Sequence, residues 1–111
     1  MSNNVLDFNK LKKNYLTIVL PDDKKTRLQV MTPTKRLLSE LTEILPEMSG
    51  DMPTEENLNA LYDFCARLMS RNRSATTITG EDLSACLDFE DLVAFFETYA
   101  TFVSEIANSK N

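Results

Sequence analysis

The segment from Asp88 to Ala107 constrains the fold of this chain more than any other. Its apolar residues recur at spacings of three and four, the period of an α-helix, and it contains neither glycine nor proline. Asp88 is placed to cap such a helix, because its side chain can accept a hydrogen bond from the backbone N–H of Asp91. We therefore predict one long amphipathic helix. Its apolar stripe comprises Leu92, Phe95, Phe96, Tyr99, Phe102, Val103 and Ile106.

This apolar stripe is too large to remain in contact with water. Four of the nine aromatic rings of the chain belong to it, so something must cover it. Two covers are open on the sequence alone, namely the preceding elements of the same chain and a partner protein. If the chain itself covers most of the stripe, we expect Phe89 and Phe102 to remain available to a partner.

Two short apolar runs near the N-terminus predict an antiparallel β-hairpin. Residues 15–20 are rich in β-branched and aromatic side chains, residues 27–31 alternate between polar and apolar, and a proline-aspartate turn joins them. A hairpin alone is marginally stable in water, so one face must pack against a helix or further strands. Its outer edge is a potential pairing site, and we place Leu16 and Ile18 among the candidate partner-binding residues.

The chain between the hairpin and the C-terminal helix predicts two longer helices and one short helix. The first is expected to begin with Thr32 as its cap and Pro33 at the first helical position. The second runs from Thr54 to about Asn72, and the short one follows Thr79. The buried stripe of the first helix is predicted to comprise Leu37, Leu38, Leu41, Ile44 and Leu45.

These elements predict one domain of the α+β class that is mainly helical. An N-terminal antiparallel β-hairpin is followed by three or four α-helices packed around the aromatic C-terminal helix. We expect residues 1–14 to be a flexible lead-in, residues 15–107 to be the single α+β domain, and residues 108–111 to be a polar tail. Residues 46–53 are predicted to be a loop. The 111 residues can bury roughly 65% of their unfolded surface, which suffices for one modest core.

The charge of the chain is unevenly distributed. Residues 1–50 carry eight Lys/Arg and six Asp/Glu, a net of +2, whereas residues 51–111 carry four and eleven, a net of −7. An acidic C-terminal half disfavours a nucleic-acid partner, because phosphate binding needs clustered positive charge. No apolar run is long enough to span a membrane, and no apolar signal-peptide core is present. We therefore expect a cytoplasmic protein without a membrane partner.

The residue types that most enzymes need are scarce in this sequence. There is no histidine, and Gly50 and Gly80 are the only glycines, which excludes a glycine-rich phosphate loop. Cys65 and Cys86 are predicted to be reduced thiols on apolar helix faces, with a redox pair as the less favoured alternative. The acidic residues that begin the C-terminal helix are explained by capping. We therefore expect no enzymatic activity, no catalytic residues, no cofactor and no metal.

Two small basic clusters leave a second interpretation open. Each is expected to be solvated or to complement a helix dipole, but each could also bind an acidic partner or a phosphate. They consist of Lys10, Lys12 and Lys13 in the lead-in, and of Arg67, Arg71 and Arg73 at the end of the second helix.

The order of these features resembles the small tail assembly chaperones of long-tailed bacteriophages and Gram-positive prophages. The resemblance covers roughly residues 15–107 and rests on layout, because that family has no short invariant motif. The stretches that carry it are Tyr15-Leu-Thr-Ile-Val-Leu-Pro-Asp22, Thr32-Pro-Thr-Lys35, Arg71-Asn-Arg73, Ile78-Thr79, and Leu87-Asp-Phe-Glu-Asp-Leu92 with Phe95-Phe96 and Tyr99.

The resemblance implies a function in virion assembly. A protein of that family binds the apolar-rich tape measure protein before the tail tube assembles around it. The expected partners are the tape measure protein and the tail tube protein. The sequence leaves open whether the chain also forms a homo-oligomer. The expected location is the cytoplasm of the bacterial host, with the protein absent from the finished virion. A structural head–tail connector component and a small DNA-binding regulator are the alternatives.

Overall fold

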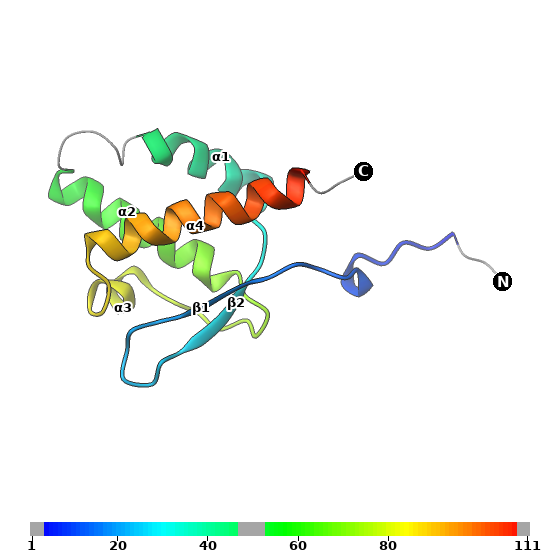
Figure 1. The fold of residues 1–111 in the computed structure, drawn as a ribbon, viewed down its shortest axis with the longest axis horizontal. Coiled ribbons are helices and arrows are strands. Elements are labelled where there is room, and N and C mark those ends of the chain that lie inside the picture. Colours follow the sequence, from blue (N-terminus) through cyan, green and yellow to red (C-terminus); the bar gives the residue numbers. More distant parts are fainter. Residues whose placement is uncertain (1–3, 47–52, 109–111) are drawn as a thin grey trace.

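Two antiparallel strands and four α-helices make up the part of the chain that the structure, a computed structural model, describes: residues 4–46 and 53–108 (Figure 1). In chain order the elements are a 3-10 turn η1 (Phe8–Lys10), strands β1 (Leu16–Val19) and β2 (Arg27–Val30), and helices α1 (Lys35–Ile44), α2 (Glu55–Ser70), α3 (Gly80–Ser84) and α4 (Phe89–Asn108). The predicted class, α+β and mainly helical, is confirmed. Gly50 and most of the predicted 46–53 loop lie outside the described residues.

The hairpin has the predicted strands and turn. Leu16 lies opposite Val30 and Val19 opposite Arg27 in an antiparallel register. In the turn, the Asp22 carboxylate accepts hydrogen bonds from the backbone N–H of Thr26 at 2.8 Å and from its hydroxyl at 2.6 Å. The hydrogen bond from the hydroxyl is the main cause that lowers the pKa of Asp22 below its usual value. The turn is thus held by a local carboxylate contact.

The outer edge of β2 is closed by the segment that follows α2. The N–H of Met31 donates to the carbonyl of Arg71 at 2.8 Å, and the N–H of Arg73 donates to the carbonyl of Gln29 at 3.0 Å. Between them Val30 and Asn72 form an antiparallel bridge. This segment therefore pairs with one side of the hairpin through an isolated bridge and two flanking backbone hydrogen bonds.

Asn72 holds that segment in place. Its side-chain amide donates to the carbonyls of Met69 and Thr76, both at 2.8 Å, and its side-chain oxygen accepts from the N–H of Thr76 and the hydroxyl of Ser74. It is 4% exposed, the single buried polar residue among those described. Its backbone has left the helix, so α2 ends at Ser70, two residues before the approximate end that the sequence predicted.

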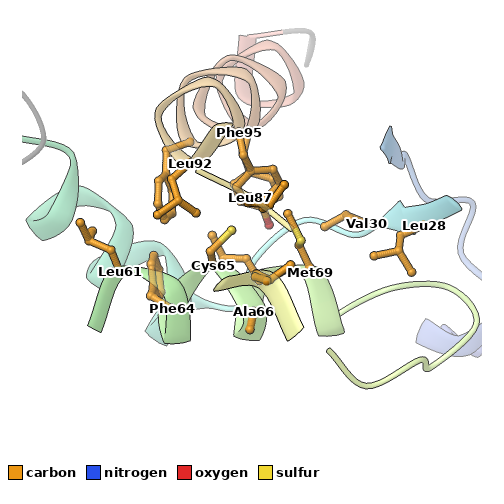
Figure 2. Packing of buried hydrophobic residues seen from close by; sticks show 14 of the residues in the cluster. Leu28, Val30, Leu61, Phe64, Cys65, Ala66, Met69, Leu87, Leu92 and Phe95 are labelled. Atoms are coloured by element: carbon orange, nitrogen blue, oxygen red, sulfur yellow. The ribbon is translucent and has the colours of Figure 1, made fainter. Parts of the chain in front are cut away.

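The core lies between α2, α4 and the inner face of the hairpin (Figure 2). Figure 2 shows Leu92 and Phe95 of α4 facing Cys65 and Met69 of α2, with Leu28 and Val30 of β2 alongside. The rings of Phe64 and Phe96 stack with their centroids 6.0 Å apart. The preceding elements of the chain therefore cover the first half of the aromatic stripe, where Leu92, Phe95, Phe96 and Tyr99 are buried. Phe102, Val103 and Ile106 are only half-buried.

Two tyrosine hydroxyls tie the helices to their neighbours. Tyr99 donates to the carbonyl of Met31 at 2.8 Å, and Tyr62 donates to the carbonyl of Leu87 at 2.6 Å. Burial raises the pKa of both phenols, so they stay protonated donors at neutral pH. Tyr99 thereby fixes α4 against the end of β2.

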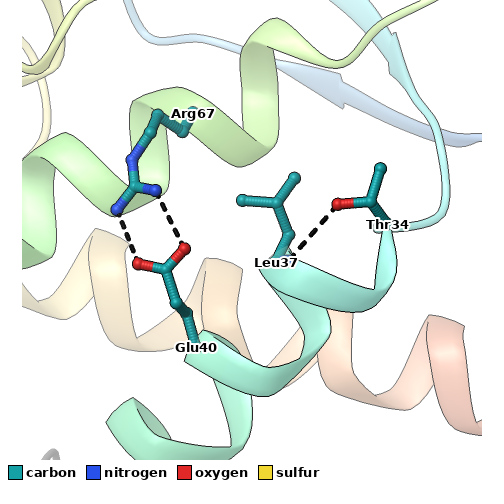
Figure 3. Close-up of polar contacts among 4 residues, drawn as sticks. All are labelled: Thr34, Leu37, Glu40 and Arg67. Carbon is teal, nitrogen blue, oxygen red and sulfur yellow. Dashed lines mark hydrogen bonds and ion pairs between the residues drawn. The ribbon is translucent and has the colours of Figure 1, made fainter.

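The start of α1 differs from the prediction. Thr34, not Thr32, caps the helix by accepting a hydrogen bond from the N–H of Leu37 at 3.3 Å (Figure 3), so Pro33 precedes the cap and does not occupy the first helical position. Thr32 is held in the linker because its carbonyl accepts a hydrogen bond from the Arg71 side chain at 2.7 Å.

The predicted buried stripe of α1 is also only partly correct. Leu41 is buried, whereas Leu37, Ile44 and Leu45 are half-buried and Leu38 is exposed. The helix therefore lies at the margin of the core, with one row of leucines turned inward. Its Glu40 forms a bidentate ion pair with Arg67 of α2, in which the two guanidinium Nη atoms lie 2.9 and 3.0 Å from the two carboxylate oxygens (Figure 3).

The caps predicted for the last two helices are confirmed. Thr79 and Asp82 form a reciprocal capping box at the start of α3. At the start of α4 the Asp88 carboxylate accepts from the N–H of Asp91 at 2.9 Å, and the Asp91 carboxylate accepts from the N–H of Asp88 at 2.9 Å. These local contacts set where both helices begin.

Candidate protein-binding groove

An apolar groove runs between β1 and the side of α4. It consists of two open hollows of about 330 and 340 Å³, and Thr98 lies in the wall of both, so the two hollows adjoin. We call the pair the β1–α4 groove. The first hollow is lined by Ile18, Val19, Leu20, Pro21, Met69, Leu87, Asp91, Ala94, Phe95 and Thr98. The second is lined by Leu16, Glu97, Thr98, Thr101, Phe102 and Glu105.

The strand that forms one wall of the groove has an unpaired edge. Leu20 donates its N–H to the carbonyl of Thr26. Hydrogen-bonded pairs recur at every second residue of an antiparallel ladder, so Leu20, Ile18 and Leu16 are the residues of this side that bond to β2. The N–H and C=O groups of Thr17 and Val19 consequently point away from β2. Within the described residues, the sheet has only the strands β1 and β2, and no strand pairs with this side of β1.

Acidic side chains border the apolar floor. Asp91, Glu97 and Glu105 all belong to α4 and line the walls of the two hollows, and no basic residue of the described part of the chain lines either of them. The Asp91 carboxylate also accepts the capping hydrogen bond from Asp88, which fixes its position at one end. The groove therefore suits an apolar segment that carries positive charge beside its apolar side chains.

The structure brings three of the four predicted partner-binding residues together. Leu16, Ile18 and Phe102 line the groove. Phe89 is half-buried against the core like the other three, but it lies at the start of α4 and does not line the groove. The role of the other three in binding a partner stays a prediction.

Sequence reasoning missed the small residues that make the groove possible. Ala94, Thr98 and Thr101 recur at helical spacing on α4, and their short side chains leave the hollow that larger residues would fill. The sequence alone could have shown that these small residues share one face of the aromatic helix. It could not have shown which strand lies opposite them, since that depends on how α4 lies over the hairpin.

The three arginines near the end of α2 do not form one site. Arg67 pairs with Glu40 and lies over the Phe64 ring, Arg71 bonds the carbonyl of Thr32, and the Arg73 guanidinium lies 5.4 Å from the centroid of the Tyr15 ring. Each guanidinium therefore has its own structural contact. This arrangement favours the first of the two interpretations that the sequence left open.

The two cysteines form no disulfide in this structure. Both are free thiols, Cys65 in the core and Cys86 half-buried. Burial raises the pKa of the Cys65 thiol to about 12, so it remains protonated and unreactive at neutral pH. Among residues 4–46 and 53–108, no three His, Cys, Asp or Glu side chains are grouped so that they could hold a metal ion. Over the same residues, every helix is too short or too polar to cross a membrane.

Compared with protein-family models, curated proteins and solved structures, the chain gives no match.

Proposed function

We propose that this protein is an assembly chaperone whose β1–α4 groove takes up an apolar segment of another polypeptide. The observation that carries the proposal is the groove itself: an apolar floor, an unpaired strand edge on one side and an acidic rim on the other. Extended segments pair with open strand edges, and amphipathic helices lie in apolar grooves. Both binding modes are open to a client here.

The client is the tape measure protein of a phage or prophage tail. The resemblance set out above supports this identity, as does the chemistry, because a long helical chain with exposed apolar faces needs cover until the tube surrounds it. The net charge of −5 keeps such a complex in solution. Release during tube assembly requires individually weak contacts that are multiplied over many copies. The protein accordingly acts in the host cytoplasm and is absent from the finished virion.

Two alternatives make different predictions. A structural head–tail connector stays in the purified particle, whereas a chaperone is lost, so mass analysis of particles separates them. A small DNA-binding regulator needs clustered positive charge, and the acidic rim of the groove repels phosphates. Salt-dependent retention of DNA on a gel would favour the regulator.

The direct test is co-expression with a tape measure fragment. The unaltered protein is expected to keep the fragment soluble, and the Ala94→Lys/Thr98→Lys variant is expected to lose this effect because two long charged side chains fill the groove. Both positions are exposed, so the change leaves the core intact. Ser104→Lys/Ala107→Lys is the matched control, since it adds the same charge to exposed positions of α4 that do not line the groove.

Two outcomes of this co-expression test would contradict the proposal. If the fragment precipitates equally with and without the unaltered protein, the chaperone function is wrong. If the control variant loses activity as fully as the groove variant, binding occurs elsewhere on α4.

A further inference from the structure

The segment before the hairpin is an exposed arm with unburied apolar side chains. Residues 4–14 form what we call the N-terminal arm, and Figure 1 shows it leaving the body of the molecule beyond β1. The radius of gyration is 15.7 Å, compared with about 13 Å for a compact chain of this length. Four large apolar side chains of the arm are exposed by 42–82%: Val5, Leu6, Phe8 and Leu11. This is the largest group of exposed apolar side chains among the described residues.

The arm and the β1–α4 groove have opposite charges. Lys10, Lys12 and Lys13 follow or interrupt the apolar residues of the arm, and all three are exposed. The groove presents the carboxylates of Asp91, Glu97 and Glu105 beside its apolar floor. An apolar segment with lysines along it is therefore complementary to the groove in both apolar character and charge.

The lengths of the two features also correspond. From Asp91 to Glu105, helix α4 rises about 21 Å at about 1.5 Å per residue. The apolar part of the arm, Val5 to Leu11, would cover about 20 Å at about 3.3 Å per residue once the turn η1 opens into an extended strand. An extended arm can also bond the outward N–H and C=O groups of Thr17 and Val19, as an added strand does.

The arm of one molecule is directed away from its own groove. The arm joins β1 at Tyr15, whose ring lies under the guanidinium of Arg73. Arg73 bonds to Gln29 along the outer edge of β2, which is the side opposite the open edge of β1. To reach its own groove, the chain would have to reverse direction within residues 12–14. A second molecule can offer its groove without any such change.

We propose that the N-terminal arm of one copy binds in the β1–α4 groove of a second copy. The arm and the groove are different surfaces, so exchange between two copies gives a closed dimer, and head-to-tail docking gives a longer chain. This assembly rests on the arm and the groove alone. One consequence rests on the proposed function: the arm covers the groove until a client displaces it.

Charge reversal tests the proposal on the full chain, without any client. Lys10→Glu/Lys12→Glu/Lys13→Glu reverses the arm, and Glu97→Lys/Glu105→Lys reverses the rim at two exposed positions. Sedimentation velocity over a range of concentrations is expected to show self-association of the unaltered protein. Each reversal alone is expected to weaken it by about tenfold or more, because attraction at several exposed pairs becomes repulsion. High salt is expected to reduce the difference.

Restoration of binding is the decisive part of the experiment. The chain that carries both reversals, and an equimolar mixture of the two singly reversed proteins, are both expected to associate again. Lys24→Glu/Lys25→Glu/Lys35→Glu is the matched control, since it changes the charge equally at exposed positions outside the arm and groove. It is expected to associate like the unaltered protein.

Three outcomes would overturn the proposal. They are a monomer at all concentrations, association that neither reversal weakens, and reversed proteins that fail to associate when combined. A concentration-independent compact monomer would mean that the arm lies on its own molecule. Failure of tape measure binding with intact self-association would instead count against the proposed function only.

Discussion

The two edges of the β-hairpin present the same backbone N–H and C=O groups, but only the edge of β2 is paired with another segment of the described chain. Along β2, the N–H of Met31 and the carbonyl of Gln29 are both bonded to the segment 71–73, which Asn72 holds from within the core. Along β1, the outward N–H and C=O groups of Thr17 and Val19 meet no strand among the described residues, and Val19 lines the groove beside α4. The closed edge is part of the structural framework, and the open edge is the surface that remains for pairing. Stability and binding should therefore respond to changes at different edges.

Asn72→Ala should have the largest effect on stability of the changes considered. It removes four hydrogen bonds and leaves the carbonyl of Met69 and the backbone of Thr76 without their partner. We expect the free energy of unfolding to fall by about 3 kcal/mol, as urea unfolding followed by circular dichroism would show. Thr17→Val is the control at the open edge and should change it by less than about 0.5 kcal/mol. Similar losses in both variants would remove the distinction between the edges.

Proline substitutions compare the two edges directly, because proline removes one backbone donor. Met31→Pro deletes the N–H that bonds Arg71, and we expect it to lower the free energy of unfolding by about 2 kcal/mol more than Met31→Ala does. Thr17→Pro deletes an outward N–H on the open edge and should cost about 1 kcal/mol or less. Thermal unfolding measures both.

The same pair of variants separates stability from association. Thr17→Pro is expected to weaken self-association of the folded protein, since a docked arm loses one backbone partner. If it destabilised the fold as much as Met31→Pro, the edge of β1 would be engaged within the molecule.

Tyr99→Phe should produce the smallest of the three stability effects. The hydroxyl of Tyr99 is the contact by which α4 holds the end of β2, and its loss should lower the free energy of unfolding by about 1 kcal/mol. Hydrogen exchange at the Met31 N–H should become faster. Tyr62→Phe is the control, because it deletes a comparable bond to Leu87 and should leave exchange at Met31 unchanged. Equal acceleration in both variants would mean that α4 does not anchor β2 through this contact.

Local sequence signals predicted most of the elements correctly. The alternation in residues 27–31 and the aspartate turn placed the hairpin, because strand faces and turn bonds depend on near neighbours. The capping pairs at Thr79 and Asp88 placed the starts of α3 and α4 for the same reason. The start of α1 was misplaced by two residues, since Thr32 and Thr34 are both suitable caps and a distant arginine holds the first in the linker.

The sequence predicted only some of the residues of the candidate site. Leu16, Ile18 and Phe102 were named as exposed apolar candidates, and all three line the groove. Phe89 was named on the same grounds and does not line the groove, because the spacing of apolar residues in a helix cannot say which of them the facing strand will reach. The small residues Ala94 and Thr98 could be identified as part of the groove only from the tertiary structure, which places β1 opposite them.

By itself, the sequence determined a hairpin followed by helices, where most of the helices begin, and which faces are apolar. Those properties follow from contacts within a few residues. Only the tertiary structure decided which edge of the hairpin is closed. Both edges offer equivalent N–H and C=O groups, and the choice depends on Asn72, which lies far from the hairpin in the chain and reaches it because α2 packs across the core.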